Sequence, residues 1–196
     1  ITKTMAGFIY EKPFQLSEDT TNYKLLTKDF VSMTGSAGRK ILKVDPAGLK
    51  LLAKTAVSDL SFFLRTSHLE KLRRIIDDPE ATDNDRFVAY VMLRNSVISA
   101  KEDLPWCQDT GTAIVIGKKG EDVYTGADDS VFLSEGIYET FRDRNLRYSQ
   151  VVPLSMFEEK NTGTNLPAQI DIYSTTGNRY EFLFITKGGG SANKTF

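Results

Sequence analysis

The stretch LPWCQDTGTAI, residues 104–114, contains Cys107, the only cysteine in a chain of 196 residues. A single cysteine is most often a small apolar group of the core. This one is followed by residues that favour turns, caps and exposed polar contacts, namely Gln108, Asp109, Thr110 and Gly111. A thiol in such a loop suits two further roles, a nucleophile or a metal ligand, and both depend on a stabilised thiolate.

Each of these two roles requires additional residues. A nucleophilic cysteine needs a general base, usually histidine, and the one histidine, His68, lies just inside a predicted helix start with nothing in the sequence to bring it near Cys107. A metal ligand needs partner ligands, and the sequence contains neither a CxxC nor an HExxH pattern. A metal site at Cys107 would therefore take its other ligands from a longer chain or from a second chain.

Composition restricts the partners and the compartment. The 25 Lys and Arg residues balance 26 Asp and Glu residues, so no global field favours nucleic acid or an anionic membrane. A lone cysteine forms no internal disulfide, and the sequence lacks a secretory apolar region or a run of membrane-spanning length. We therefore expect a cytoplasmic or mitochondrial protein that is not secreted and binds neither nucleic acid nor membrane.

Helices are predicted in four places. Asp45 and Pro46 are typical of an N-cap with proline at the first helical position, and apolar residues then recur at helical spacing as far as Phe63. A fourth helix is predicted from about residue 129 to residue 144.

The second and third helices are predicted from capping boxes. Ser67 with Glu70 precedes one apolar-periodic segment, and Thr82 with Asp85 precedes another. The third helix carries an apolar set that should face a core, namely Phe87, Val88, Val91, Met92 and Ile98.

Strands are predicted from short β-branched runs. The run AIVIG, residues 113–117, suits a buried strand. Residues 161–169, NTGTNLPAQ, are predicted to form a loop, and Ile170 and Ile172 then alternate with polar neighbours. After a turn at residues 176–178, the segment RYEFLFITK is predicted to return as the partner strand of a hairpin.

Two shorter strands, YKLLTKDF and KILKV, are predicted around the TGSAG turn near the amino terminus. Together these elements predict an α+β fold, with helices covering one or both faces of a largely antiparallel sheet.

The motifs LPWCQDTGTAIV and KGGGSANK, in this order and at this separation, resemble the amino-terminal domain of the class I, iron-sulfur-dependent fumarate hydratases. The segments SEDTTNYKLL, KVDPAGLKLLA and NTGTNLPAQI are also similar to this family, so the resemblance extends over nearly the whole chain. Related tartrate dehydratase subunits share the CQDTG core.

The resemblance implies that residues 1–196 form the amino-terminal domain of a longer hydro-lyase, whose carboxy-terminal domain lies outside this chain. Such an enzyme reversibly hydrates fumarate to L-malate and would be a homodimer. Because the chain starts at Ile1 without an initiator methionine, we expect it to be a fragment. Two alternatives are a tartrate dehydratase alpha-type subunit and a non-catalytic module for substrate binding and dimerisation.

The resemblance also implies roles for individual residues. Cys107 matches one of three thiolate ligands of a four-iron four-sulfur cluster, and the other two ligands lie outside the chain. Gln108 and Asp109 match residues that face the substrate, Arg147 matches a carboxylate-binding arginine, and Gly190 matches a loop position whose backbone touches the substrate. A cluster iron with an open position would act as the Lewis acid, and Asp109 is the nearest candidate for proton transfer.

The chemistry of a dicarboxylate is compatible with these roles. Arginine binds carboxylates through two parallel hydrogen bonds, which suits Arg147, although surface arginines are common. The glycines at 188–190 could turn backbone N–H groups toward an anion, with Lys187 and Lys194 adding positive charge. Asp109 also suits an Asx-turn or a helix cap, and the two roles are compatible.

Overall fold

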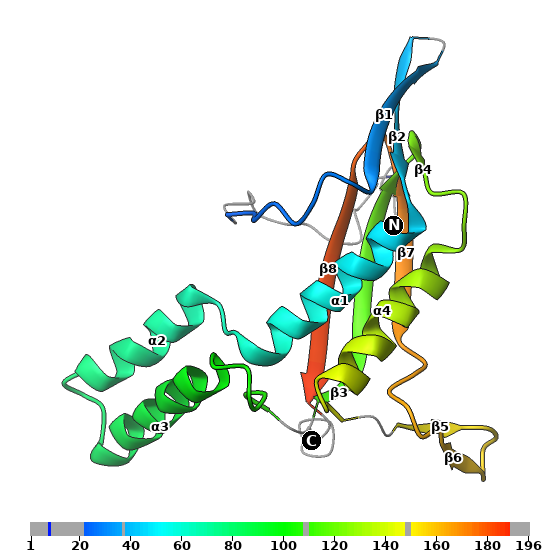
Figure 1. The fold of residues 1–196 in the computed structure, drawn as a ribbon. Helices are drawn as coiled ribbons and strands as arrows, with labels where there is room; N and C mark the ends of the chain where they lie inside the picture. Colours follow the sequence, from blue (N-terminus) through cyan, green and yellow to red (C-terminus); the bar gives the residue numbers. More distant parts are fainter. Residues whose placement is uncertain (1–7, 9–21, 37, 108–109, 148–149, 189–196) are drawn as a thin grey trace, which may run out of the picture.

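A computed structural model describes residues 8, 22–36, 38–107, 110–147 and 150–188 of the chain. Two helices lie side by side against one face of a three-stranded sheet, and a helical hairpin projects from one end of this unit (Figure 1). The two packed helices are α1 (Pro46–Phe62) and α4 (Asp129–Asp143), the hairpin consists of α2 (Thr66–Asp77) and α3 (Asp83–Ser99), and the central strands are β3 (Thr110–Gly120), β7 (Gln169–Thr175) and β8 (Tyr180–Gly188). The predicted α+β class is confirmed.

The central sheet has the order β7-β3-β8, with β3 parallel to β7 and antiparallel to β8. The predicted strand in residues 113–117 is confirmed and lies at the centre. The predicted hairpin between the strand at Ile170 and Ile172, which is β7, and RYEFLFITK, which is β8, is wrong, because β3 separates the two strands. Alternation of apolar residues reports which face of a sheet a strand buries, and it does not identify the neighbouring strand.

The connection between β7 and β8 crosses the end of β3. The backbone N–H of Gly120 donates to the carbonyl of Arg179 at 2.9 Å, and the N–H of Asp122 donates to the carbonyl of Gly177 at 2.9 Å. A Cβ atom at Gly120 would lie 2.2 Å from the Gly177 carbonyl oxygen, so only glycine allows the crossing. The turn predicted at residues 176–178 therefore exists, but it spans an intervening strand.

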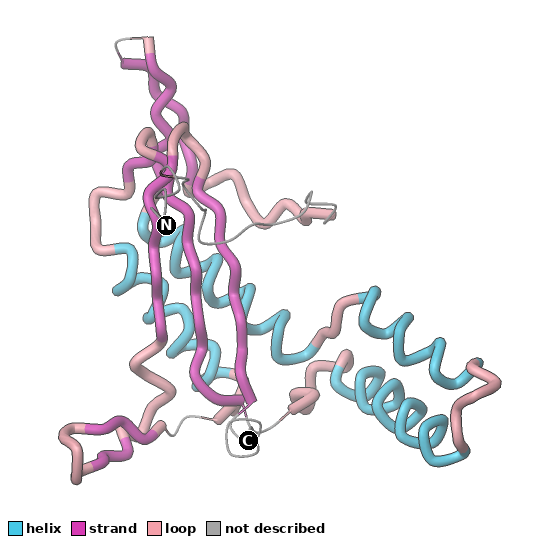
Figure 2. The backbone as a smooth tube through the Cα atoms, turned by 180° about the vertical axis from the view of Figure 1, so that it is seen from behind, coloured by secondary structure: helices cyan, strands magenta, loops and turns pink. Residues whose placement is uncertain are grey.

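The core lies between the central sheet and the two packed helices. Ala113 and Val115 of β3 are fully buried against apolar residues of α1 and α4. The helical contributors are Leu49, Ala53, Val57, Leu133, Ile137 and Phe141. Helices cover this one face of the sheet, which decides between the one-face and two-face arrangements that the sequence left open (Figure 2).

Gly136 of α4 sits at the closest approach of the two packed helices. A Cβ atom at this position would lie 2.3 Å from the backbone oxygen of Lys50 and 3.0 Å from the Cβ atom of Ala53. The small residue thus sets the distance between α1 and α4.

Gly136→Ala is expected to lower the free energy of unfolding by about 1–3 kcal/mol, the usual cost of overpacking a core. The higher helix propensity of alanine, worth about 1 kcal/mol, is smaller than the clash with backbone atoms. Urea denaturation of the variant checks this. Gly35→Ala is the matched control, because no atom lies within 4 Å of a Cβ built there. Equal stability of Gly136→Ala and wild type would contradict the tight helix contact.

Three of the four predicted helix starts are confirmed and one is wrong. The helix predicted from about residue 129 is α4, which begins at Asp129. The Asp45 side chain accepts from the N–H of Ala47 at 2.8 Å, and Thr82 with Asp85 forms a capping box. The predicted capping box at residues 67 and 70 is absent from its helix, because the N-cap of α2 is Arg65, two residues earlier, and it makes no side-chain cap. Residue 67 consequently lies inside the first turn, where its hydroxyl is no longer in the N-cap position.

A second sheet combines β1 (Val31–Ser36), β2 (Arg39–Val44) and β4 (Val123–Tyr124). The prediction of KILKV as a strand is confirmed by β2. The prediction of residues 23–30 as its partner is wrong, since the partner strand β1 begins at residue 31. The turn between β1 and β2 is tight, because Ser36 pairs directly with Arg39. The six residues just before this turn therefore pair with β2, and the residues further from it do not. A short hairpin of β5 (Val151–Pro153) and β6 (Glu159–Asn161) completes the strands described.

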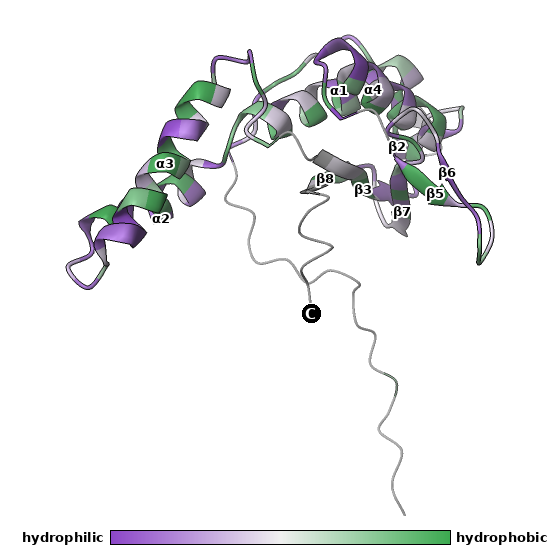
Figure 3. Cartoon of the chain, turned by 90° about the horizontal axis from the view of Figure 1, so that it is seen from below, coloured by the Kyte–Doolittle hydropathy of each residue, from purple (hydrophilic) through white to green (hydrophobic). Residues whose placement is uncertain are grey.

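The face of the central sheet opposite α1 and α4, here called the open sheet face, carries apolar residues among polar ones. Leu183 and Ile185 of β8 alternate with core-facing residues and are 40% and 37% exposed. Ile114, Ile116 and Tyr173 lie on the same face by strand alternation and register. Figure 3 shows α1 and α4 on one side of the sheet and no described helix covering the other.

The predicted apolar set of α3 is also exposed. Phe87 is 64% exposed, and the other members of the set, Val88, Val91, Met92 and Ile98, are more than two-fifths exposed. A helix that carries apolar residues on several sides is normally covered by other protein or by membrane. None of the described helices is long and apolar enough to cross a membrane.

Candidate functional site

The candidate site lies at the end of the central sheet where β3 begins and β8 ends, here called the Cys107 end. Thr110 at the start of β3 is the register partner of Gly188 at the end of β8. Both strand ends lie at the same end of the sheet in Figure 2. Gln108, Asp109, Gly190 and Lys194 lie outside the described residues. The backbone of Lys187 belongs to β8.

The segment that leads to Cys107 is anchored through Trp106. Its backbone N–H donates to the carbonyl of Ser61 at 3.1 Å, and its indole Nε1–H donates to the carbonyl of Leu60 at 3.0 Å. Its own carbonyl accepts from the side chain of Asn95 at 3.0 Å. Cys107 is therefore held between the end of α1 and the helix α3. Cys107 is partly exposed.

Arg147 follows the carboxyl end of α4 and is exposed. The residue before it, Leu146, is buried in the core, which fixes the point where the chain leaves the helix. Three residues earlier, Arg144 pairs with Glu102 at 2.7 Å and lies over the ring of Phe62 at 5.3 Å. Since Glu102 belongs to the segment before Cys107, this pair connects the chain around Arg147 with the chain around Cys107.

A third segment, residues 161–168, reaches the same end and leads into β7. Two hydrogen bonds join it to Gln150, which lies three residues after Arg147. The N–H of Thr162 donates to the carbonyl of Gln150 at 2.8 Å. The side chain of Gln150 donates to the carbonyl of Pro167 at 3.1 Å. The sequence predicted a loop here without a role for any of its residues. Within it, Asn165 is buried.

The structure does not support a pair of Cys107 with His68. His68 is exposed on α2, in the helical hairpin that projects away from the sheet (Figure 1). In the described part of the chain, no group of three or more His, Cys, Asp and Glu side chains could hold a metal ion. Cys107 is the only thiol of the chain, so a metal site built on it would need further ligands from outside the described residues.

A second polar cluster occupies the opposite end of β3. Asp129 at the start of α4 is 5% exposed, and its Oδ2 atom accepts from Lys119 Nζ and from the hydroxyl of Tyr180, both at 2.7 Å. Burial opposes ionisation of Asp129, but the hydrogen bonds outweigh it and lower the pKa of the carboxyl. Burial, together with the Asp129 charge, raises the pKa of Tyr180. This cluster joins α4 to two strands.

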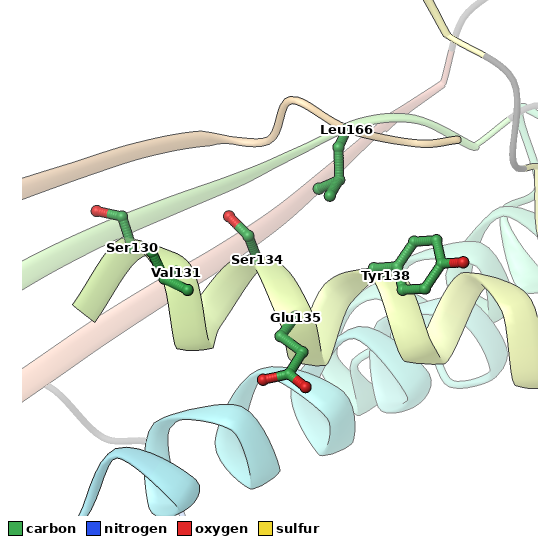
Figure 4. A pocket seen from close by; sticks show the side chains of 6 residues that line it. All are labelled: Ser130, Val131, Ser134, Glu135, Tyr138 and Leu166. Atoms are coloured by element: carbon green, nitrogen blue, oxygen red, sulfur yellow. The ribbon is translucent and has the colours of Figure 1, made fainter. Parts of the chain in front are cut away.

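A shallow hollow lies on the outer side of α4, beneath Leu166 (Figure 4). Its lining consists of Ser130, Val131, Ser134, Glu135, Tyr138 and Leu166, none of which is a site residue predicted from the sequence. Glu135 is already paired with Lys50 at 2.8 Å. The candidate site therefore remains at the Cys107 end.

The chain is similar in sequence to known proteins. A family model described as fumarate hydratase (Fumerase) matches residues 50–196. The chain is 55% identical over 189 residues to the anaerobic class I fumarate hydratase of Escherichia coli (strain K12), which covers 96% of this chain and 34% of that protein. It is also 55% identical over 184 residues to "Fumarate hydratase 1, mitochondrial" of Leishmania major, with 93% and 34% covered.

A more distant relative is the putative L(+)-tartrate dehydratase subunit alpha of Methanocaldococcus jannaschii. Its identity is 27% over 118 residues, which cover 58% of this chain and 41% of that protein. The chain spans about a third of the length of the fumarate hydratases it matches.

Proposed function

Because the chain belongs to the fumarate hydratase (Fumerase) family, we propose that it is the amino-terminal region of a longer hydro-lyase that reversibly hydrates fumarate to L-malate. The observation that carries this proposal is the 55% identity to class I fumarate hydratases across 96% of the chain. The tartrate dehydratase subunit is only 27% identical over 58% of the chain, so fumarate is favoured over tartrate as the substrate.

Substrate binding in this proposal depends on the carboxylates of fumarate and malate. Arg147 would bind one carboxylate through its planar guanidinium, and Gln108 and the backbone of Gly190 would provide further polar contacts. The Thr110–Gly188 pair supports this grouping, because the segments that contain residues 108–109 and 190 both leave the sheet from this pair. The ion pair between Arg144 and Glu102 connects the segment that contains Arg147 with the segment that leads to Cys107.

The chemical step in this proposal needs a Lewis acid and a proton carrier. Cys107 would supply one thiolate to a four-iron four-sulfur cluster whose other ligands lie outside residues 1–196. The cluster, when bound, would supply a Lewis-acidic iron. Asp109 would exchange a proton with the substrate, and the three hydrogen bonds of Trp106 would hold the Cys107 segment in place.

The open sheet face supports the proposal that further polypeptide packs on this region. Leu183, Ile185 and Tyr173 are exposed on it, and Ile114 and Ile116 beside them are partly buried. A sheet face with exposed apolar residues normally packs against another layer. The relatives are about three times as long as this chain, so we propose that another part of the same full-length polypeptide, including its carboxy-terminal domain, covers this face. We also propose that the full-length protein is a homodimer and that it is located in the cytoplasm or the mitochondrion.

The proposed function is tested by reconstituting two proteins anaerobically with iron and sulfide: the full-length protein and residues 1–196. We expect the full-length protein to bind a stoichiometric cluster and to hydrate fumarate, and residues 1–196 to do neither, because the described donor set supplies a single thiolate. Iron and sulfide content and malate formation are the measurements.

Cys107→Ser in the full-length protein is the control, and it should lose the cluster. A full-length protein that turns over L(+)-tartrate but not fumarate would contradict the proposed substrate. Cluster binding and fumarate turnover by residues 1–196 alone would contradict the division of the site between this region and the rest of the protein.

A further inference from the structure

Asn165 is a buried polar residue whose side chain makes no hydrogen bond to the part of the chain that the structure describes. It is 3% exposed, and neither Oδ1 nor Nδ2 has a partner among the described residues. Buried amides in native proteins nearly always have partners, because an unpaired one loses its bonds to water without replacement. The carboxamide of Asn165 therefore calls for a partner beyond the residues described.

The surrounding loop has several hydrogen bonds of its own, and none of those described involves the Asn165 side chain. Before it, the N–H of Gly163 donates to the Asn161 side chain at 2.9 Å. After it, the N–H of Leu166 donates to the hydroxyl of Thr164 at 3.2 Å. The loop is thus shaped by its other polar residues, and shaping the turn does not explain an asparagine at position 165.

The loop also places Asn165 at the Cys107 end of the sheet. It leads directly into β7, whose first residue, Gln169, pairs with Ile114 near the start of β3. The bonds between Gln150 and residues 162 and 167 tie it to the chain that follows Arg147. Asn165 therefore belongs to the same cluster of segments as the site residues inferred from the sequence.

We infer that the Asn165 carboxamide binds the dicarboxylate substrate, with Nδ2 donating to a carboxylate oxygen; this inference rests on the proposed function. A carboxylate is an acceptor, and the amide provides two N–H donors in a buried setting where an unmet donor is costly. A site built around such a donor binds a ligand with the matching acceptor and discriminates against one without it. Asn165 would thus complement Arg147 with a neutral donor.

The test compares Asn165→Leu with wild type in the full-length, cluster-loaded protein. Leucine has a similar size and removes the unpaired amide, so the melting temperature without substrate should stay the same or rise. The KM for fumarate and for L-malate should rise by about 10- to 100-fold, the usual effect of losing a hydrogen bond to a charged group. The stabilisation of the protein by added L-malate should shrink in parallel.

The opposite pattern would overturn the inference. If Asn165 instead bonds to another part of the protein, Asn165→Leu would lower the melting temperature without substrate and leave KM unchanged. Asn165→Asp, which keeps the shape and adds a negative charge facing a dianion, should raise KM more than leucine does; an unchanged KM in this variant would also overturn the inference.

Two controls keep the result separate from that of the proposed function. Asn178→Leu is the matched variant, since its side chain donates to the carbonyl of Lys40 at 3.1 Å at the other end of β8, and its KM should equal that of wild type. Wild-type turnover of fumarate tests the function itself. Failure of the function appears in the wild type, whereas failure of this inference appears as a wild-type KM in the variants.

Discussion

Lys119→Met is expected to lower the free energy of unfolding of this chain by about 3–5 kcal/mol, the usual effect of leaving a buried charge without its partner. Asp129 is 5% exposed, and Lys119 Nζ lies 2.7 Å from its Oδ2 atom. The remaining bond from Tyr180 does not neutralise the carboxylate. Urea denaturation at pH 7 measures the effect.

Two controls identify the cause of this loss. The double variant Lys119→Met/Asp129→Leu should recover much of the lost stability, because it removes both charges from the buried site. Arg73→Met should change stability by less than about 1 kcal/mol, because the Arg73–Asp77 pair is exposed on both sides. A small effect of Lys119→Met would show that water reaches Asp129 despite its burial.

The same pair predicts a dependence on pH. The folded state lowers the pKa of Asp129 below its ordinary value of 3.8, so the carboxylate stabilises the wild type above that value, and the stabilisation is lost as the pH falls through the folded pKa. Without Lys119, burial of Asp129 favours its protonated form. The stability difference between wild type and Lys119→Met should therefore shrink as the pH falls from 7 toward 4.

Asp109→Asn in the full-length protein is expected to lower kcat for fumarate hydration by about 10²- to 10⁴-fold, the usual contribution of a positioned proton-transfer group. The amide keeps the size and most of the hydrogen bonding of the carboxylate but exchanges no proton at neutral pH. KM should change far less, because a group that acts only in the transition state contributes little to ground-state binding. Steady-state kinetics in both reaction directions measure both constants.

Iron content is the control for this variant, since Asp109 lies two residues from Cys107. A variant that retains its cluster and turns over at the wild-type rate would show that Asp109 only shapes the loop. Asp103→Asn is the matched substitution on the same segment. Asp103 is exposed four residues before Cys107, and its replacement should leave kcat unchanged.

Features determined by neighbouring residues were predicted from the sequence. The N-cap at Asp45 and the capping box of Thr82 and Asp85 depend on side chains within three positions of the helix start, so the local pattern was sufficient. The box expected at Ser67 and Glu70 failed because the N-cap of α2 is Arg65, two residues earlier.

The candidate site was predicted only in part. The sequence indicated Cys107, Asp109 and Arg147 through motifs and chemistry, and it offered no reason to bring their segments together. Asn165 carries no chemical signal in the sequence, since asparagine is common in loops. Its burial without a hydrogen-bond partner among the described residues is a property of the packed structure and could be recognised only there.

By itself the sequence determined the helix-forming segments, the buried strand at residues 113–117 and the family, because each depends on residue types and short spacings. The tertiary structure decided that β3 separates β7 from β8 and that Thr110 meets Gly188, 78 positions further along the chain. The alternation of apolar and polar residues along a strand is the same whichever strand lies beside it, so it does not decide the pairing. The pairing depends on which strands bury their apolar faces under α1 and α4. It also depends on Gly120, which lets the β7–β8 connection cross the end of β3. Those contacts join residues distant in sequence, and no local pattern records them.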